Sequence, residues 1–485
     1  MEGWLALADP ESGLIPRNSK KLHWNAEDAA ADNYPFMVLT SSFTNRERFN
    51  GRMREMLETE IKLTSRIDSL PDTFDFKSQA FYSKKPNLYS ILLNSSEYIK
   101  DGLLPLTEWL GESPWSDRMI SILDDMWKHA PIDTPYGKII SNNIETNGEM
   151  LQVLSRIYWM TGNEKYLEWA IRLGNYYLLG NHHPTRDSTL LKLRDHGCEI
   201  VSGLCELYVT VYFAKPDIKK QYEKPIHLML DRILEVARTD HGMFYDEFNP
   251  QTGRPVTKRL ADTWGYTYNG FYTVYLIDKT PVYREATLKV LSNIHRYTNY
   301  RWEGGSADGY ADSIESGLNL YNREPLPSVA GWIDSEIKVM WGKQKESGII
   351  EGWHGDGNFA RTTIMYSLWK TQGTQIQPWR SDVVYGAIRK GDSLIVQIES
   401  RTPWKGQLIL DKPRHKEVMK LPLDWPRINQ FPEWFTVDND KIYLLRNQDG
   451  ELLKEVTGEQ LTDGIPIDIQ DKLPVQLIIT PKPTS

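Results

Sequence analysis

The sequence predicts a ring of α-helical hairpins followed by a small antiparallel β domain. Three observations support this prediction. Amphipathic helical segments recur in pairs between residues 141 and 371, and a short turn joins the members of each pair. Equivalent helices start roughly fifty residues apart, which exceeds the usual open helical repeats of about 34 to 47 residues and favours a closed ring. After Gly373 the chain changes to short β-branched runs broken by Gly, Pro, Asn and Asp.

The helical part is expected to span residues 28–375, after an irregular segment at 1–27 with turn signals at Asp9-Pro10 and Ile15-Pro16. Residues 28–65 predict two helices with a break near Ser41. Further helices are expected at residues 89–100, 116–129, 141–161, 164–179, 196–213, 218–239, 263–277, 283–298, 311–321, 329–341 and 360–371. Together they make about six hairpins.

The C-terminal domain is expected to span residues 376–485, with the boundary at 374–382. Its β-branched runs lie at residues 383–386, 393–399, 407–410, 441–445 and 475–480. Short strands at such spacing, separated by turn residues, are typical of an antiparallel β-sandwich.

Composition restricts the class of partner. The chain has 485 residues and a formal net charge of −8, which argues against nucleic acid as the main partner. Its 17 Trp and 25 Tyr suit either a large core or a surface that stacks on flat ligands. Cys198 and Cys205 would lie about 10 Å apart on one helix, too far for a disulfide.

No apolar run has the length of a membrane span, and the N-terminus does not read as a signal peptide as it stands. We expect a periplasmic or secreted location, with the cytoplasm as the alternative. Nothing in the sequence calls for a metal or another cofactor, and nothing in it predicts an oligomeric state.

Polar side chains gather at the start of every second helix, whereas the partner helices start without them. The polar starts contain Asp28, Asp32 and Asn33; Asn143, Glu145 and Asn147; Asp195, His196 and Glu199; Asp262, Trp264, Tyr266, Tyr268 and Asn269; and Asp308, Tyr310, Asp312 and Glu315. If alternate helices form an inner ring, all these starts meet at one mouth. Carboxylates and amides bind hydroxyl groups and aromatic faces stack on sugar rings, so such a mouth suits carbohydrate.

The stretch 351–369, with the sequence EGWHGDGNFARTTIMYSLW, follows the same pattern at the last helix. It adds Trp353, His354, Asp356 and Arg361 to the predicted mouth. Asp356 or Asn358 can cap the helix that follows, because a short acceptor there satisfies free backbone N–H groups.

This layout resembles the six-hairpin, (α/α)6-toroid carbohydrate enzymes. These include glycoside hydrolases such as the glucuronyl hydrolases, and toroid polysaccharide lyases that carry a C-terminal β domain. The resemblance covers nearly the whole chain as architecture. It transfers no individual catalytic residue, so the residue roles below come from the chemistry of the side chains.

Hydrolysis of a glycosidic bond needs one carboxylic acid to protonate the leaving oxygen and a second carboxylate to activate water or attack the sugar. The candidates are Asp262 with Asp308 or Asp312, beside Trp264, Tyr266 and Tyr310, and also Asp356. The other substrate-binding candidates are Asn143, Glu145, Tyr268, Asn269, Trp353, His354 and Arg361. The competing interpretation is that most of these Asp residues are simple helix caps.

Elimination from a uronate is the alternative chemistry, in which Tyr and His act as base and acid. His196, Tyr266 or Tyr268, Asn143 or Asn269, His354 and Arg361 would form that site. Hydrolysis of a uronate-containing glycan is preferred because carboxylates outnumber Tyr and His at the helix starts. Arg17, Arg194 and Arg361 are the expected partners of a substrate carboxylate. A non-catalytic sugar-binding protein is the third reading.

Overall fold

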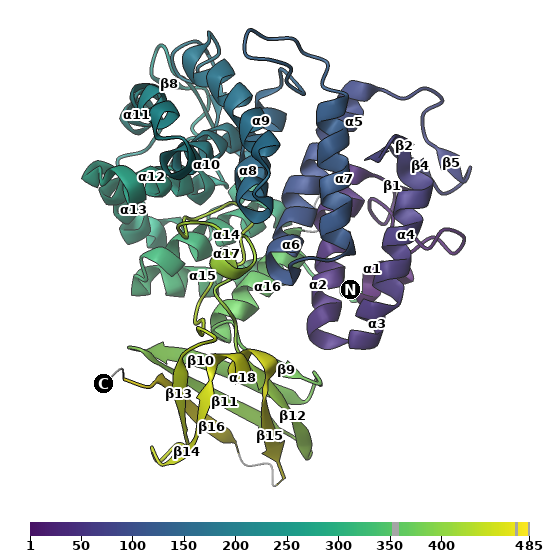
Figure 1. Ribbon diagram of the computed structural model, residues 1–485, viewed down its shortest axis with the longest axis vertical. Helices are drawn as coiled ribbons and strands as arrows, with labels where there is room; N and C mark the ends of the chain where they lie inside the picture. Colours follow the sequence, from purple (N-terminus) through teal and green to yellow (C-terminus); the bar gives the residue numbers. More distant parts are fainter. Residues whose placement is uncertain (352–357, 471–473, 484–485) are drawn as a thin grey trace.

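The computed structural model describes residues 1–351, 358–470 and 474–483. It consists of a helical unit and a β unit stacked along the long axis of the molecule (Figure 1). The chain runs through the helices first and enters the β unit after α16.

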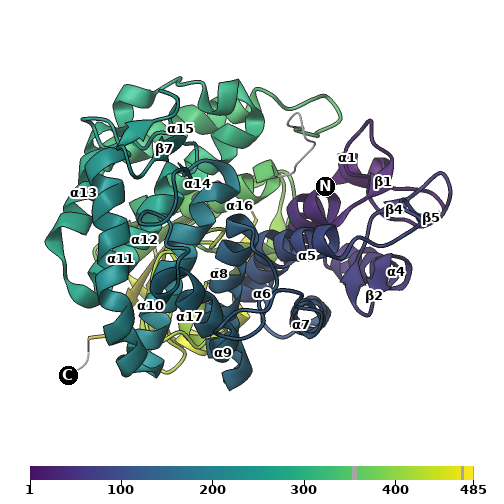
Figure 2. The same ribbon diagram turned by 90° about the horizontal axis from the view of Figure 1, so that it is seen from above.

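The helices form two concentric layers, seen from above in Figure 2. The inner segments are η1 (Ala26–Asn33) with α2 (Tyr34–Thr44), α5 (Leu88–Glu97) with η2 (Tyr98–Leu103) and α6 (Leu104–Leu110), α8 (Ile144–Thr161), α10 (Glu199–Ala214), α12 (Trp264–Asp278), α14 (Ala307–Arg323) and α16 (Asn358–Lys370). The outer helices are α4 (Arg52–Thr64), α7 (Pro114–Lys128), α9 (Glu164–Gly174), α11 (Pro216–Val236), α13 (Pro281–Asn293) and α15 (Pro327–Trp341). Six inner–outer hairpins therefore follow one another.

The last inner helix closes the ring. Neighbouring inner helices contact each other in chain order from α8 to α16, and α16 also contacts α2 and η1 at the start of the chain. Shorter helical segments link the hairpins: α1 (Glu2–Ala6), α3 (Arg46–Asn50), η3 (Asn175–Leu179), η4 (Asp195–Cys198), η5 (Ile294–Tyr297) and η6 (Trp302–Gly305). The helical unit is therefore a toroid.

Inner helices are apolar on nearly all sides because they are surrounded by other helices. The stretch Asp195–Ala214 has a mean hydropathy of 1.2, as high as that of a membrane span, but 83% of it is buried inside the toroid. Two glycines allow α8 and α10 to lie in close contact. A Cβ on Gly148 would lie 2.4 Å from the backbone N of Ile200, and one on Gly203 would lie 2.4 Å from the carbonyl oxygen of Gly148.

The first two inner segments each contain a π-helical turn, η1 and η2, and the two turns pack against each other. A Cβ on Gly102 would lie 2.8 Å from the carbonyl oxygen of Ala31, so only glycine fits this crossing. π-helical turns are often found at functional sites. Both turns carry carboxylates, Asp28 in η1 and Asp101 in η2.

The β unit contains two antiparallel sheets that share one hydrophobic core. The larger sheet has the order β10 (Val383–Lys390), β11 (Ser393–Ser400), β16 (Val475–Pro481), β13 (Ile442–Arg446) and β14 (Leu452–Thr457). The smaller has the order β15 (Ile465–Ile469), β12 (Trp404–Ile409) and β9 (Gln375–Gln377). This is the expected β-sandwich. One short helix, α18 (Gly458–Asp463), packs against its strands, whereas α17 (Arg414–Glu417) lies among the helices of the toroid, in contact with α6 (Figure 1).

Short sheets also decorate the toroid. They pair β1 (His23–Trp24) with β4 (Phe74–Asp75) and β5 (Ala80–Phe81), β2 (Ser65–Ile67) with β3 (Leu70–Pro71), and β6 (Leu191–Lys192) with β7 (Glu247–Asn249) and β8 (Arg254–Pro255).

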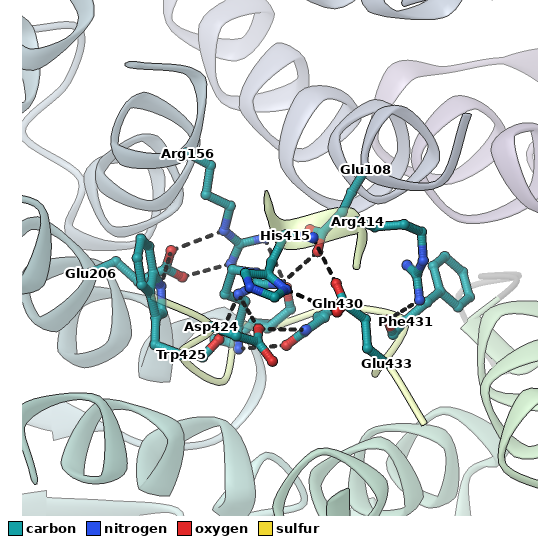
Figure 3. A network of polar contacts seen from close by, with 12 residues as sticks. Glu108, Arg156, Glu206, Arg414, His415, Asp424, Trp425, Gln430, Phe431 and Glu433 are labelled. Carbon is teal, nitrogen blue, oxygen red and sulfur yellow. Dashed lines mark hydrogen bonds and ion pairs between the residues drawn. The ribbon is translucent and has the colours of Figure 1, made fainter. Parts of the chain in front are cut away.

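The connection from β12 to β13 leaves the sandwich and enters the toroid. We call its innermost part, residues 424–434, the plug. Trp425, Phe431 and Trp434 belong to the hydrophobic core of the toroid and not to that of the sandwich. Side chains from α6, α8 and α10 surround the plug, as Figure 3 shows. The two units are therefore interlocked.

The predicted fold class, a toroid followed by a β-sandwich, is confirmed. Several elements differ from expectation. The break in the first helix pair falls between Asn45 and Gly51, not at Ser41, because Asn45 caps the short α3 through the backbone N–H of Arg48. The helix α6 was not expected, and α14 starts at Ala307, four residues early, because Ser306 caps it. The irregular N-terminal segment contains α1 and β1.

Candidate functional site

The N-terminal ends of the inner helices carry two clusters of ionisable side chains. Local sequence sets where these helices begin: Asn143 accepts from the backbone N–H of Glu145 at 2.8 Å, and Ser306 accepts from that of Gly309 at 2.9 Å. Because these caps are Asn and Ser, the carboxylates nearby are not consumed in capping. The side chain of Asp262 accepts only from the adjacent backbone N–H of Thr263 among the described hydrogen bonds.

The first cluster joins Glu97 of α5, Glu149 of α8 and His196 of η4. Nδ1 of His196 lies 3.2 Å from Oε1 of Glu149, and one ligand atom from each of the three residues lies within 4.8 Å of the others. The Glu149 side chain is 1% exposed, whereas that of His196 is 32% exposed. The imidazole therefore connects a buried carboxyl to the open side of the site.

Protonation in this cluster is strongly perturbed. Burial raises the pKa of Glu97 well above its usual value, and it also raises the pKa of Glu149 although His196 opposes the shift. Burial alone would lower the pKa of His196, but Asp195, Glu149, Glu97 and Asp101 outweigh it and raise that pKa well above 6.5. The cluster holds protons that can be donated to a bound substrate. One imidazole nitrogen and two carboxylate oxygens are also a donor set that fits a divalent cation.

A buried polar network lies below the first cluster. Lys100 contacts Asp101 at 2.8 Å and donates to Glu199, and Gln152 donates to the same Glu199. Burial opposes the charge on Asp101, yet Lys100 holds its pKa below the usual value. These side chains fix Asp101 as an anion facing the first cluster.

The second cluster contains Asp262 before α12 and Asp308 and Asp312 on α14. Burial raises the pKa of Asp262 well above its usual value, and Glu303 and Asp308 add to the effect. Burial also raises the pKa of Asp312, and Asp308 and Asp262 again contribute. Asp308 is less buried and stands in the first turn of α14, where the helix dipole favours its charged form. Two buried carboxyls of raised pKa, Asp262 and Asp312, are thus neighbours of a less buried one, Asp308, an arrangement suited to acid–base chemistry.

Arg361 neutralises the inner side of the second cluster. Its Nε donates to both carboxylate oxygens of Glu315 at 3.0 Å, and its Nη2 lies 4.0 Å from Oδ1 of Asp312. The hydroxyl of Tyr266 donates to Oε2 of Glu315 at 2.9 Å and to Oδ1 of Asp312 at 3.3 Å. Arg361 is 2% exposed, so its charge is already used inside the protein.

The structure brings six predicted residues to the two clusters: His196, Asp262, Tyr266, Asp308, Asp312 and Arg361. Asn143 and Glu145 lie at the rim, where Glu145 is 3.9 Å from Lys192. Trp353, His354 and Asp356 lie outside the described residues.

Four other predicted residues are buried. Trp264 donates to Ser313 at 3.0 Å and Tyr268 donates to the carbonyl of Gly242 at 2.6 Å, and both rings are 0% exposed. Asn269 is 1% and Tyr310 is 4% exposed. Trp264 and Tyr268 therefore offer no face on which a sugar can stack.

Sequence reasoning missed Glu97, Glu149, Lys100 and Asp101. Glu97 lies near the far end of the predicted helix 89–100 and Asp101 just beyond it, and the π-helical turn η2 begins between them. Glu149 had a detectable signal, because it follows Glu145 by four residues on the same predicted helix. Residues four apart lie about one helical turn apart and share a face.

No family model matches this sequence, and no curated protein matches it either. Solved structures do resemble it in chain path. An inactive variant of an alpha-1,6-mannanase from Salegentibacter sp. HEL1_6, in complex with alpha-1,6-mannotetrose, is 11% identical, with a TM-score of 0.45 over 64% of this chain and 95% of that chain.

Two further solved structures are comparable. A family 76 glycoside hydrolase (mannosidase) from Bacteroides thetaiotaomicron is 13% identical, with a TM-score of 0.44 over 63% of this chain and 94% of that chain. A sugar epimerase from a ruminal bacterium is 15% identical, with a TM-score of 0.42 over 62% and 85%. The assignment of the toroid rests on the helix order and contacts of this chain.

Proposed function

We propose that this protein is a glycoside hydrolase that uses the carboxyl pair Asp262 and Asp308. The observation that carries the proposal is the contrast between these two side chains. Asp262 is buried and its pKa is raised well above the usual value, partly by the charge of Asp308, whereas Asp308 lies at a helix N-terminus. A protonated carboxyl next to an ionised one is the arrangement that glycosidic hydrolysis needs.

In this proposal Asp262 donates its proton to the glycosidic oxygen as the bond to the leaving sugar breaks. Asp308 either accepts a proton from the attacking water or stabilises the positive charge on the sugar ring. Asp312 sits behind them, hydrogen-bonded to Tyr266, and its own raised pKa keeps the local charge low enough for both to coexist. His196 and Glu149 face the same mouth and bind or exchange protons with sugar hydroxyls.

The charge of the site favours a neutral glycan. Within the described residues, the cations expected to meet a substrate carboxylate are already paired: Arg361 with Glu315, Arg17 with Asp28 at 2.9 Å, and Arg194 with Glu247 at 3.1 Å. A uronate brought to this site would meet like charge at Asp308 and Asp101, which the proposal treats as anions. The uronate substrate predicted from the sequence therefore stays a prediction, and we propose a neutral sugar at the scissile bond.

Elimination is less well supported by the geometry. A tyrosine that abstracts a proton works best with a lowered pKa, but burial and Glu315 raise the pKa of Tyr266 well above 10. A sugar-binding protein without catalysis has no use for a carboxyl of raised pKa, since hydroxyl groups are bound as well by ionised carboxylates.

The test is a digest of matched neutral and uronate-containing oligosaccharides, followed by mass analysis and ultraviolet absorbance of the products. Products that have gained one water, without the absorbance of an unsaturated uronate, support hydrolysis. Asp262→Asn and Asp308→Asn should each lower that turnover by about 100-fold or more while leaving ligand binding measurable. Unsaturated products contradict the proposal, and binding without turnover by the parent protein supports the sugar-binding reading.

A further inference from the structure

The plug is an irregular segment with the burial of a core helix. Trp425, Arg427 and Ile428 are 0% exposed, and Asn429, Gln430 and Phe431 are 1% exposed. Loops normally stay at the surface because their backbone groups need partners. A loop held this deep inside another unit requires dedicated contacts, and the toroid provides them.

Arginines satisfy the plug backbone. Arg156 of α8 donates to the carbonyl of Ile428 at 3.2 Å, and Arg414 donates to that of Phe431 at 2.9 Å. Arg427 donates to the carbonyl of Trp425 at 2.7 Å. Each of these arginines is also held by a buried carboxylate, so its position is fixed as well as its charge. The pairs are Arg156–Glu206, Arg414–Asp411 and Arg427–Glu108.

The tip of the plug reaches both clusters of the candidate site. Asn429 donates from Nδ2 to Oδ1 of Asp101, the anion that faces His196. Ile428 packs in one small cluster with Cys198, two residues after His196, and with Tyr266, which holds Asp312. The tip thus forms the floor of the site between its two halves.

The backbone conformation at Asn429 also restricts which residue can stand at the tip of the plug. Asn429 has φ +61, in the left-handed region that Asn and Gly adopt far more readily than other residues. This conformation turns the Asn429 amide toward η2. A residue that combines a left-handed backbone with a buried side-chain donor is tightly determined by its surroundings.

We propose that Asn429 is a positioning residue of the candidate site. Its amide holds Asp101 in the place from which Asp101 and Lys100 support the His196–Glu149 pair. The C-terminal unit would therefore complete the floor of the site in the toroid. The expected effect on kcat rests on the proposed function. The placement of Asp101 by Asn429 can be tested without any measurement of turnover.

Asn429→Gly is the informative variant, because glycine keeps the left-handed backbone and removes only the amide. Asn299→Gly is its matched control: Asn299 has φ +62, is exposed and lies outside the site. Both variants are made in the full-length chain. Their melting temperatures, their kcat and KM on the hydrolysed oligosaccharide, and the NMR titration of the His196 ring are then compared.

We expect Asn429→Gly to lower kcat by about 10- to 100-fold with KM within about twofold, since misplacing a catalytic group costs this much. The His196 titration midpoint should move to lower pH, because Asp101 no longer faces the imidazole while Asp195, Glu149 and Glu97 still do. Asn299→Gly should match the parent in both readouts.

An unchanged His196 midpoint in Asn429→Gly overturns the proposal. This holds even if the melting temperature and kcat both fall, because the loss of a merely structural residue lowers both without moving the midpoint. If the parent protein shows no hydrolase activity, the proposed function is wrong. The His196 titration still tests whether Asn429 positions Asp101. If Asn429→Gly does not fold, Asp101→Asn, which removes the charge that Asn429 is proposed to hold in place, replaces it under the same criterion.

Discussion

Nδ1 of His196 lies 3.2 Å from Oε1 of Glu149, so a partly exposed ring is paired with a carboxyl that is almost fully buried. Replacing Glu149 by Gln keeps the shape and removes the exchangeable charge. We expect Glu149→Gln to lower kcat by about 100-fold or more, in the range that general acid–base groups contribute. Initial rates on the hydrolysed oligosaccharide measure the effect. Glu164→Gln on the outer helix α9, where Glu164 pairs with exposed Lys215, is the control and should leave the rate unchanged.

The pH profile should report the coupling between Asp262 and Asp308. Asp262 acts as an acid, so the rate holds while Asp262 is protonated and falls as the pH rises through its pKa. The charge of Asp308 raises that pKa. Asp308→Asn keeps the shape of the side chain and removes its charge, so the alkaline limb of its residual rate should lie at lower pH than in the parent. If the alkaline limb of Asp308→Asn stays at the pH of the parent or moves to higher pH, Asp262 is not the acid whose pKa Asp308 raises. Asp217→Asn, with a 95% exposed side chain, is the control.

The same carboxyl should make stability depend on pH. The folded pKa of Asp262 is raised above its unfolded value near 4, so the folded state binds the proton more tightly. Its contribution is fully present below the unfolded pKa and is lost as pH rises through the folded pKa, by about 1.4 kcal/mol for each unit of difference. Asp262→Asn should therefore melt at a higher temperature than the parent at pH 8, and the gain should vanish at pH 4. Thermal unfolding at the two pH values checks this, and a loss of stability at pH 8 would refute it.

The buried pair Arg427–Glu108, at 2.7 Å, should be costly to break from one side. Arg427→Met leaves the Glu108 carboxylate buried and uncompensated, so we expect a loss of about 3–5 kcal/mol in the free energy of unfolding. Lys482→Met breaks an exposed pair with Glu455 at 2.9 Å and should cost less than about 1 kcal/mol. Denaturant unfolding of both variants gives the comparison. Equal losses would mean that the plug is not anchored as described.

The crossing of η1 and η2 should tolerate no side chain. Gly102→Ala would place a Cβ 2.8 Å from the carbonyl oxygen of Ala31, and we expect it to destabilise the chain by about 1–3 kcal/mol. Gly331→Ala, in the exposed middle of α15, has nothing within 4 Å and should stabilise by roughly 0.5–1 kcal/mol. Melting temperatures that move in the same direction would argue against this reading of the crossing.

Sequence periodicity was sufficient to predict the toroid because each inner–outer hairpin is local in sequence. The polar starts at Asp262, Asp308 and Asp312 were predictable for the same reason, since each precedes or opens an apolar helix. Stacking roles for Trp264 and Tyr268 were less predictable. Aromatic side chains near a helix start serve the core as readily as a ligand, and the sequence does not distinguish the two uses.

Contacts between distant segments left no such pattern. Asp101 lies in the π-helical turn η2, which begins directly after Glu97 and changes the register of the helix without a sequence signal as clear as a cap. The plug follows from no local periodicity at all, because Asn429 meets Asp101 across 328 positions. The predicted division at residues 374–382 describes where helices give way to strands, while the toroid core also takes in Trp425 and Phe431.

The plug also sets an order of events during synthesis. Glu108 and Arg427 are 319 positions apart, so a ribosome releases most of the helical ring long before the partner of Glu108 has been made. Until then, Glu108, Arg156 and Glu206 surround a core that lacks its centre, and closure of so long a loop is slow. The nascent ring should therefore stay loosely packed and in need of protection from aggregation until the plug emerges.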